Sequence, residues 1–214
     1  MLCTILGAPG AGKGTQALFL KEKLGVPIIA TGNLLRDAMK AETELGKSIK
    51  DAMNSGHLVP DDLIVDLVSK RLAEEDCKNG AILDGFPRTL FQAEAIDKIF
   101  PVDFALSIEV PDEEIISRLT GREICTKCQA TYHVEYNPTS VPGVCDRCGA
   151  LITRRNDDDR EIVKERLVVY HKETEPVKKY YEDLGKLKKV IGQREVADTQ
   201  RLVAEAVGVE YDNN

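Results

Sequence analysis

Apolar and polar residues alternate along the chain in two different patterns. Short, nearly continuous apolar runs predict strands over Leu2–Leu6, Val26–Ala30, Ala81–Leu83, Phe104–Val110 and Lys189–Ile191. The stretches between them are amphipathic at helical spacing, which predicts helices over Gly14–Leu24, Leu34–Lys40, Gly46–Asn54, Asp61–Glu75, Leu90–Ile99, Glu113–Thr120, Ile162–Leu184 and Val196–Val207. Because strands and helices alternate, the pattern favours an α/β fold whose parallel sheet is covered by helices on both faces.

The helix predicted over residues 61–75 carries the clearest end signals. Pro60 precedes it, and Asp61 and Asp62 place negative charge where a helix N-terminus is positive. Gly56 is a stop signal for the helix before it.

One segment, residues 121–158, breaks the alternation with glycines, prolines and polar turns, and we call it the insertion. It contains Cys125-x-x-Cys128 and Cys145-x-x-Cys148, which are sixteen residues apart. This spacing is typical of a structural zinc site, where four thiolates close a tetrahedral coordination sphere. Iron or cobalt also fits four sulfur ligands. The sequence therefore predicts a metal-stabilised insertion with no open coordination position for catalysis.

Charge and composition limit the partners of the protein. The 214 residues have a formal net charge of −7, so the overall field repels a polyanion such as DNA or RNA. The chain has no Trp and only 5% aromatic residues, which disfavours a surface that stacks bases. It contains no apolar run of about 18 residues, and its first residues do not resemble a secretion signal. We expect a cytoplasmic protein that binds neither nucleic acid nor membrane.

A phosphate-binding loop is predicted after the first strand. The run Gly7-Ala8-Pro9-Gly10-Ala11-Gly12-Lys13-Gly14-Thr15 joins that strand to a helix, which is the context such a loop requires. Glycines let backbone N–H groups approach an anion, the helix N-terminus adds positive charge, and Lys13 would reach the terminal phosphates. Gly14 stands where the general motif has Ser or Thr, so the usual hydroxyl contact to Mg²⁺ is not predicted at that position.

Four segments together make the sequence similar to a known family. The run 7–16 resembles the phosphate loop of nucleoside monophosphate kinases, and the run 31–36 (TGNLLR) resembles the acceptor-site segment of adenylate kinases. The run 83–88 (LDGFPR), together with Gln92, resembles the most distinctive motif of that family. Arg155 to Arg166, with Asp157 and Asp158 between them, resembles the arginines of the lid. The similarity covers essentially the whole chain, and the long insertion resembles the cysteine-containing lid of many bacterial members.

The resemblance implies reversible phosphoryl transfer, ATP + AMP = 2 ADP, with Mg²⁺ as cofactor and a structural Zn²⁺ in the insertion. It also implies a core formed by residues 1–30, 60–120 and 159–214, an AMP-binding segment over 31–59 and a lid over 121–158. Family members are usually monomers. An AMP phosphate oxygen is already anionic, so the chemistry needs positioning and charge stabilisation rather than a general base.

The resemblance also implies roles for individual residues. The catalytic groups would be Lys13, Asp84, Arg88, Arg122, Arg155 and Arg166. ATP would contact Gly10, Ala11, Gly12, Lys13, Gly14, Thr15, Arg118, Arg122, Thr131, Tyr132, the Gly192 region and Arg194. AMP would contact Thr31, Arg36, His57, Leu58, Val59, Gly85, Phe86, Pro87, Arg88, Gln92, Arg155 and Arg166. Asp84 would hold Mg²⁺ through water, and the Gln92 amide would recognise adenine with a donor and an acceptor.

Several alternatives remain at this level. The acceptor could be UMP, CMP or GMP, although Thr31 and Gln92 favour AMP, and a zinc-ribbon ATPase acting on nucleic acid is disfavoured by the acidic charge. Asp84 could cap a helix at Thr89 instead of serving Mg²⁺. Asp157 and Asp158 could form an acid–base pair, but contacts that close the lid fit the chemistry better. We expect His57, His133 and His171 to ligate no metal.

Overall fold

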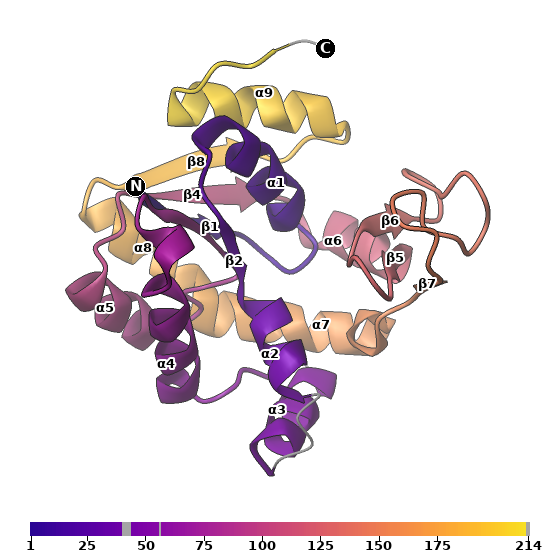
Figure 1. Cartoon of the computed structure of the whole chain (residues 1–214), viewed down its shortest axis with the longest axis horizontal. Helices are drawn as coiled ribbons and strands as arrows, with labels where there is room; N and C mark the ends of the chain where they lie inside the picture. Colours follow the sequence, from indigo (N-terminus) through magenta and orange to yellow (C-terminus); the bar gives the residue numbers. More distant parts are fainter. Residues whose placement is uncertain (40–43, 56, 213–214) are drawn as a thin grey trace.

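The computed structural model describes residues 1–39, 44–55 and 57–212. A parallel five-stranded sheet with the order β2-β3-β1-β4-β8 forms its centre. The strands are β1 (Leu2–Leu6), β2 (Ile28–Ala30), β3 (Ala81–Asp84), β4 (Phe104–Glu109) and β8 (Leu187–Ile191). Figure 1 shows the sheet at the middle of the molecule with helices around it, which confirms the predicted α/β class.

The helices cover both faces of the sheet. They are α1 (Lys13–Leu24), α2 (Thr31–Met39), α3 (Glu44–Asn54), α4 (Asp61–Leu72), α5 (Leu90–Ile99), α6 (Asp112–Thr120), α7 (Arg160–Val169), α8 (Glu175–Asp183) and α9 (Val196–Val207). None of the helices within the described ranges is long and apolar enough to span a bilayer.

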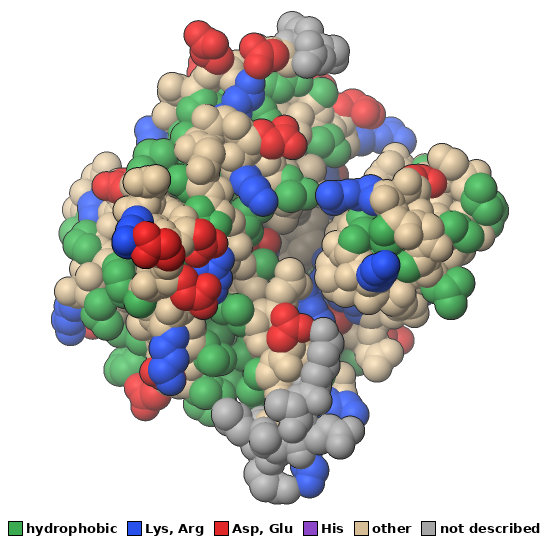
Figure 2. All heavy atoms as spheres, viewed as in Figure 1, with side chains coloured by type: hydrophobic (Ala, Val, Ile, Leu, Met, Phe, Trp, Pro, Cys, Tyr) green, Lys and Arg blue, Asp and Glu red, His purple; other side chains and the backbone are tan. Residues whose placement is uncertain are grey.

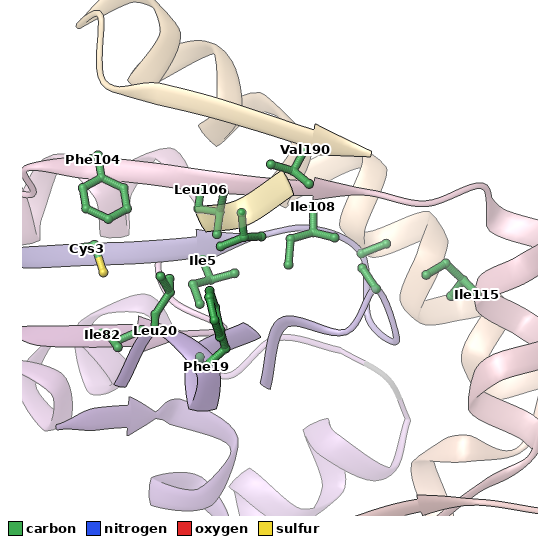
Figure 3. Packing of buried hydrophobic residues seen from close by; sticks show 14 of the residues in the cluster. Cys3, Ile5, Phe19, Leu20, Ile82, Phe104, Leu106, Ile108, Ile115 and Val190 are labelled. Atoms are coloured by element: carbon green, nitrogen blue, oxygen red, sulfur yellow. The ribbon is translucent and has the colours of Figure 1, made fainter. Parts of the chain in front are cut away.

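Strand β1 divides the core into two clusters because successive side chains point to opposite faces of a sheet. Cys3 and Ile5 pack with residues of α1, α6, α7 and α9, whereas Leu2 and Leu6 pack with residues of α2, α3, α4, α5 and α8. Figure 3 shows the first cluster, with Phe19 and Leu20 of α1 beside Ile5 and Leu106 of the sheet. The sheet is therefore buried on both faces, as the near-continuous apolar runs of its strands require.

The insertion forms a separate lobe with a small antiparallel sheet. Its strands are β5 (Arg122–Cys125), β6 (Thr131–His133) and β7 (Ile152–Thr153), paired in the order β6-β5-β7. In the space-filling view this lobe stands beside the core with a hollow between them (Figure 2). The 3-10 turn η2 (Asn156–Asp158) leads back from the lobe into α7.

Several predicted boundaries need correction. The helix predicted over 61–75 ends at Leu72, and a 3-10 turn, η1 (Glu75–Cys77), follows it. The single helix predicted over 162–184 begins at Arg160 and contains a π-helical segment, η3 (Tyr170–Thr174), between α7 and α8. Helix α2 begins at Thr31, directly after β2. Two predictions, a helix that reaches Lys40 and a helix stop at Gly56, concern positions outside the described residues.

Candidate active site

The phosphate loop lies at the carboxyl end of β1, where open parallel sheets bind ligands. Its first glycine, Gly7, has a φ of 139°, and a Cβ there would lie 2.6 Å from the Ile108 carbonyl oxygen, so no other residue fits. Gly12 caps α1 with a left-handed φ of 91°. The loop therefore wraps the N-terminus of α1, where free N–H groups attract an anion.

Lys13 lies inside this loop. Its Nζ donates to the carbonyl oxygens of Gly7 and Ala8 at 2.9 and 2.8 Å. The pKa of Lys13 is lowered to about 7, chiefly by burial and also by repulsion from Arg88, Arg166 and Arg122, effects that the Asp84 carboxylate only partly offsets. Lys13 is thus held in a site that disfavours its charge until an anion arrives.

Asp84 lies beside the glycine that follows Lys13. It is the last residue of β3, which pairs with β1, and its Oδ2 lies 3.4 Å from the position that a Gly14 Cβ would occupy. The carboxylate therefore approaches α1 at the point where the general motif places a hydroxyl. The alternative that Asp84 caps α5 is wrong, because Thr89 is the N-cap and its Oγ1 accepts from the Gln92 backbone N–H at 3.2 Å.

Two arginines, one at the start of the insertion and one on α7, are held by carboxylates. Arg122 of β5 forms a two-point ion pair with Asp158, with Nε–Oδ2 and Nη2–Oδ1 distances of 2.8 and 2.5 Å. Arg166 of α7 contacts Asp157 Oδ2 at 2.9 Å and Asp158 Oδ1 at 3.4 Å. Asp157 and Asp158 thus orient guanidinium groups, which disfavours the acid–base alternative and leaves the arginines fixed in one geometry.

The remaining arginines complete a crowded group of cations. Arg88 donates from Nε to the Gly85 carbonyl at 2.7 Å, and Arg36 donates to the Asn33 side chain. Burial lowers the pKa values of Arg36, Arg88 and Arg166, and repulsion among the arginines adds to the effect. Burial also lowers the pKa of Arg155 to about 10, and its buried Nε has no hydrogen-bond partner in the described part of the chain. Such a group of partly desolvated cations favours a polyanionic ligand.

A small cavity of about 40 Å³ lies beside these cations. The residues predicted for AMP that line it are Thr31, His57, Leu58, Val59, Gly85, Arg88 and Gln92. Three further residues that line the cavity were not predicted as contacts of AMP, because their helical spacing indicates only core positions: Gly32, Leu35 and Ile64. Phe86 and Pro87 are buried instead, and the Phe86 carbonyl accepts a hydrogen bond from Thr4, so their side chains do not line the cavity.

A larger hollow, of about 260 Å³, lies at the base of the insertion. It is lined by Thr120, Arg154, Arg155, Asn156, Asp158 and Asp159. Arg155 belongs to the predicted phosphate contacts, whereas Arg154 and Asn156 were not predicted because neither carries a distinguishing motif. The hollow therefore adjoins the cation group through Arg155 and Asp158.

The predicted contacts to the ATP base lie around the loop after β8. Arg118 of α6 donates to the Gln193 carbonyl at 3.0 Å and pairs with Glu114, while Arg194 lies 5.8 Å over the Tyr136 ring. This loop is therefore in contact with both α6 and the insertion. Thr131 is exposed, but the Tyr132 side chain is buried, so only its backbone remains available to a nucleotide.

The four cysteines of the insertion converge. Their Sγ atoms lie within 4.8 Å of one another, and Cys125–Cys148 and Cys128–Cys145 are 3.4 and 3.5 Å apart. The Tyr132 hydroxyl, 3.3 Å from Cys145 Sγ, lowers the pKa of that thiol. Four converging sulfurs with hydrogen bonds directed at them fit a thiolate-bound ion such as zinc. No histidine belongs to this group within the described ranges.

Known proteins are similar to this chain in sequence along nearly its full length. The family model described as adenylate kinase matches residues 5–186. The chain is 50% identical to the adenylate kinase of Caldicellulosiruptor saccharolyticus, with 98% of this chain and 100% of the relative covered. It is 51% identical to that of Caldicellulosiruptor bescii at the same coverage, and 48% identical to that of Clostridium acetobutylicum over 92% of this chain and 94% of the relative. Because the family model covers most of the chain and these relatives nearly all of it, the chain belongs to the adenylate kinase family.

Proposed function

We propose that the cation group between the phosphate loop and the insertion is the site where this adenylate kinase transfers a phosphoryl group between ATP and AMP. One observation carries the assignment. Five cations gather there from different parts of the sequence, and burial is the largest cause that lowers the pKa of each: Lys13, Arg36, Arg88, Arg155 and Arg166. Two facing nucleotides supply the negative charge that such a group lacks.

ATP would lie with its phosphates on the loop. The backbone of Gly10, Ala11, Gly12, Gly14 and Thr15 would contact these phosphates at the N-terminus of α1, and Lys13 would turn to the terminal phosphates from the Gly7 and Ala8 carbonyls. Arg122 would contact the phosphates from the insertion. Arg118 and Arg194 flank the loop after β8 and would enclose the base and ribose together with Thr131 and the Tyr132 backbone.

AMP would place its base in the small cavity next to Thr31 and Gln92, and its phosphate against Arg36 and Arg88. The Arg88 guanidinium is linked by its Nε to the Gly85 carbonyl, which also accepts from Thr31 Oγ1 at 2.9 Å. The same short run, residues 85–88, thus joins the base cavity to the phosphate contact. This coupling fixes the distance between the two ends of the bound nucleotide.

The transfer step needs no proton removal. An anionic oxygen of the AMP phosphate forms a bond to the terminal phosphorus of ATP, and the bond from that phosphorus to the bridging oxygen breaks, leaving ADP on both sides. Five cations would stabilise the charge on the transferring group: Lys13, Arg88, Arg122, Arg155 and Arg166. Asp157 and Asp158 hold two of these arginines in place before the substrates arrive, which reduces the reorganisation needed in the transition state.

Both metals of the family have suitable donors. The Asp84 carboxylate adjoins Gly14 at the phosphate loop and would hold Mg²⁺ through water while the phosphates complete its shell. Bound Mg²⁺ neutralises phosphate charge. Cys125, Cys128, Cys145 and Cys148 would hold Zn²⁺ in a closed coordination sphere, where the ion stabilises the insertion.

Residues 31–59 and 121–158 would close over AMP and ATP respectively, against a core of residues 1–30, 60–120 and 159–214. Helix α3 already contacts the turn η2, so the two segments meet at one point. Closure would exclude water that hydrolyses the donor. Because one chain supplies every part of the site, we expect a monomer to be active, and the cytoplasmic location stays a prediction.

The test is a kinetic panel of AMP, GMP, UMP and CMP as acceptors with ATP as donor. We expect kcat/KM for AMP to exceed that for UMP by at least about a hundredfold, because the wrong base leaves buried polar groups unpaired. A folded Lys13→Met variant should lose roughly a hundredfold or more in turnover. Comparable kcat/KM values for AMP and UMP would contradict the adenine assignment, and near-normal turnover by the variant would contradict the role of Lys13.

A further inference from the structure

The Gln92 amide, which lines the base cavity, is held by two protein groups, one a hydrogen-bond donor and the other an acceptor. Its Oε1 accepts from the Arg88 backbone N–H at 2.7 Å, and its Nε2 donates to Asp61 Oδ1 at 2.7 Å. Gln92 is only 2% exposed. An amide buried between these two neighbours has little freedom to exchange its ends.

The chemistry of the two neighbours fixes which end is which. A backbone N–H only donates, and an ionised carboxylate only accepts, so the reversed amide would lose both hydrogen bonds. Asp61 is itself held, because its Oδ2 accepts from Thr89 Oγ1 at 2.9 Å. Asp61 is the first residue of α4 and Thr89 is the N-cap of α5, so two helix termini support the arrangement.

The fixed amide leaves one N–H and one oxygen lone pair for a ligand. The edge of adenine offers an amino donor at position 6 and a ring acceptor at N1, which match that pair. Hypoxanthine has nearly the same shape but carries an oxygen acceptor at position 6 and an N–H donor at N1. It therefore matches only the reversed amide.

We propose that Asp61 is a specificity-determining positioning residue, which locks the Gln92 amide in the orientation that accepts AMP and rejects 6-oxopurine nucleotides. Asp61 acts through Gln92 and does not line the cavity itself. The inference rests on the proposed role of Gln92 at the AMP base. It assigns base selectivity to a carboxylate that the sequence presents only as part of a favourable helix N-terminus.

The experiment compares AMP with inosine monophosphate as acceptors for ATP, in the parent protein and in Asp61→Ala. Removing the carboxylate takes away one of the two hydrogen bonds that hold the amide, so the reversed orientation costs less and the ratio of kcat/KM for AMP over inosine monophosphate should narrow by about tenfold or more. Asp62→Ala is the matched control, because Asp62 is exposed in the same first turn of α4 and its loss changes the charge equally. This control should keep the parent ratio.

Melting curves accompany the kinetics so that folding is separated from selectivity. If Asp61→Ala does not fold, Asp61→Asn replaces it, since an amide of the same size offers a donor as well as an acceptor and permits the reversed Gln92. In a folded variant, KM values that rise equally for both acceptors, with an unchanged ratio, would overturn the proposal.

A Gln92→Leu variant distinguishes this failure from that of the proposed function. If it narrows the ratio while Asp61→Ala does not, Gln92 recognises the base and only the role of Asp61 is wrong. If the parent protein itself does not prefer AMP, or if Gln92→Leu keeps the parent ratio, the recognition of adenine by Gln92 is wrong and the inference falls with it.

Discussion

At the scale of single residues, Lys13 shows how burial of a cation couples the stability of the fold to pH. Its pKa near 7 lies below that of a lysine in the unfolded chain, so the unfolded state binds more protons above about pH 7. The contribution of Lys13 therefore destabilises the fold most at and below neutral pH, and the free energy of unfolding gains as pH rises toward the ordinary lysine value. Bound phosphates would raise the pKa of Lys13, because they favour the charged amine.

A calorimetric prediction follows for ligand binding. At pH 8, a bisubstrate analogue that joins two adenosines through phosphates should bind with uptake of up to about one proton, because Lys13 becomes charged next to the phosphates. Titrations in buffers of different ionisation enthalpy measure the uptake. A Lys13→Arg variant, whose guanidinium stays charged, should show none of it. Equal proton uptake by the two proteins would assign the titration to another group.

The residue scale also shows what a sequence reveals about a site. Lys13, the cysteine pairs and Arg88 occur in motifs with a distinctive spacing; the cysteines converge as that spacing predicts, while the roles of Lys13 and Arg88 stay predictions. Two tertiary contacts, those of Asp61 and of Tyr132, were not predicted, for a common reason. Their partners, Gln92 and Cys145, lie far along the chain, and only tertiary packing brings the pairs together.

At the scale of elements, predictions succeeded where local signals agree with burial. Strand β1 and helices α5 and α9 have the predicted bounds. The three strands of the insertion were not predicted, because strands of two to four residues leave no periodicity to detect. The π-helical segment was also missed, since a single widened turn changes the apolar spacing of a long helix very little.

This π-helical segment ties α6 to α8 through His171. Its Nε2 lies 2.9 Å from Asp112 Oδ2 at the start of α6, and its Nδ1 lies 2.9 Å from Glu175 Oε2 at the start of α8. Hydrogen bonds to the two carboxylates raise the pKa of His171, with that to Glu175 contributing most, and Lys178 shares Glu175 with it. When protonated, His171 thus joins the start of α6 to the start of α8 through Asp112 and Glu175.

The sign of the pH effect follows from the raised pKa. Stabilisation by His171 is fully present below its unfolded pKa and is lost as pH rises through the folded value. A His171→Gln variant should therefore melt at a lower temperature than the parent at pH 6, with a smaller difference at pH 9. Lys172→Gln, which removes an exposed neighbouring cation, is the control. A deficit in the melting temperature that is independent of pH would contradict this account.

We expect the insertion to depend on a bound metal because it buries so little else. Its apolar cluster has three buried members, Cys125, Tyr132 and Cys145, and two of these are among the four cysteines proposed to hold Zn²⁺. Metal affinity, on the order of 10 kcal/mol for zinc peptides, becomes folding free energy in such a unit. Exchanging Cys125 and Cys128 for Ser should therefore lower the melting midpoint, while turnover at a temperature where the insertion stays folded changes little.

A chelator provides the control for the metal prediction. It should lower the melting midpoint of the parent protein and leave that of the double variant unchanged, because the variant has no site to lose. An unchanged parent melting curve would contradict a structural role. Loss of turnover in a protein whose insertion is demonstrably folded would instead give the metal a part in catalysis.

At the scale of the whole molecule, the site is assembled from parts that are remote in the sequence. The carboxyl ends of β1 and β3 bring the phosphate loop and Asp84 together at one edge of the sheet. Arg122 enters from the start of the insertion, which stands apart from the core as a lobe (Figure 2), whereas Arg166 lies on α7 of the core. Asp158, at the end of the insertion, contacts both guanidinium groups, so under the proposed function the position of the lobe decides whether Arg122 reaches the transferring phosphoryl group.

Closure should therefore be visible as a change in distance when both nucleotide sites are filled. Probes introduced as unnatural amino acids at the exposed positions Lys50 of α3 and Lys127 of the insertion report on the two moving segments, and a pair at Lys98 and Lys189 reports on the core. The bisubstrate analogue should shorten the distance between positions 50 and 127 and leave the core pair unchanged, because its phosphates attract the arginines of both segments to one point. If the analogue binds tightly and the distance between positions 50 and 127 does not change, the cation group already has the geometry that it needs for transfer. The proposed closure of the two segments would then be wrong.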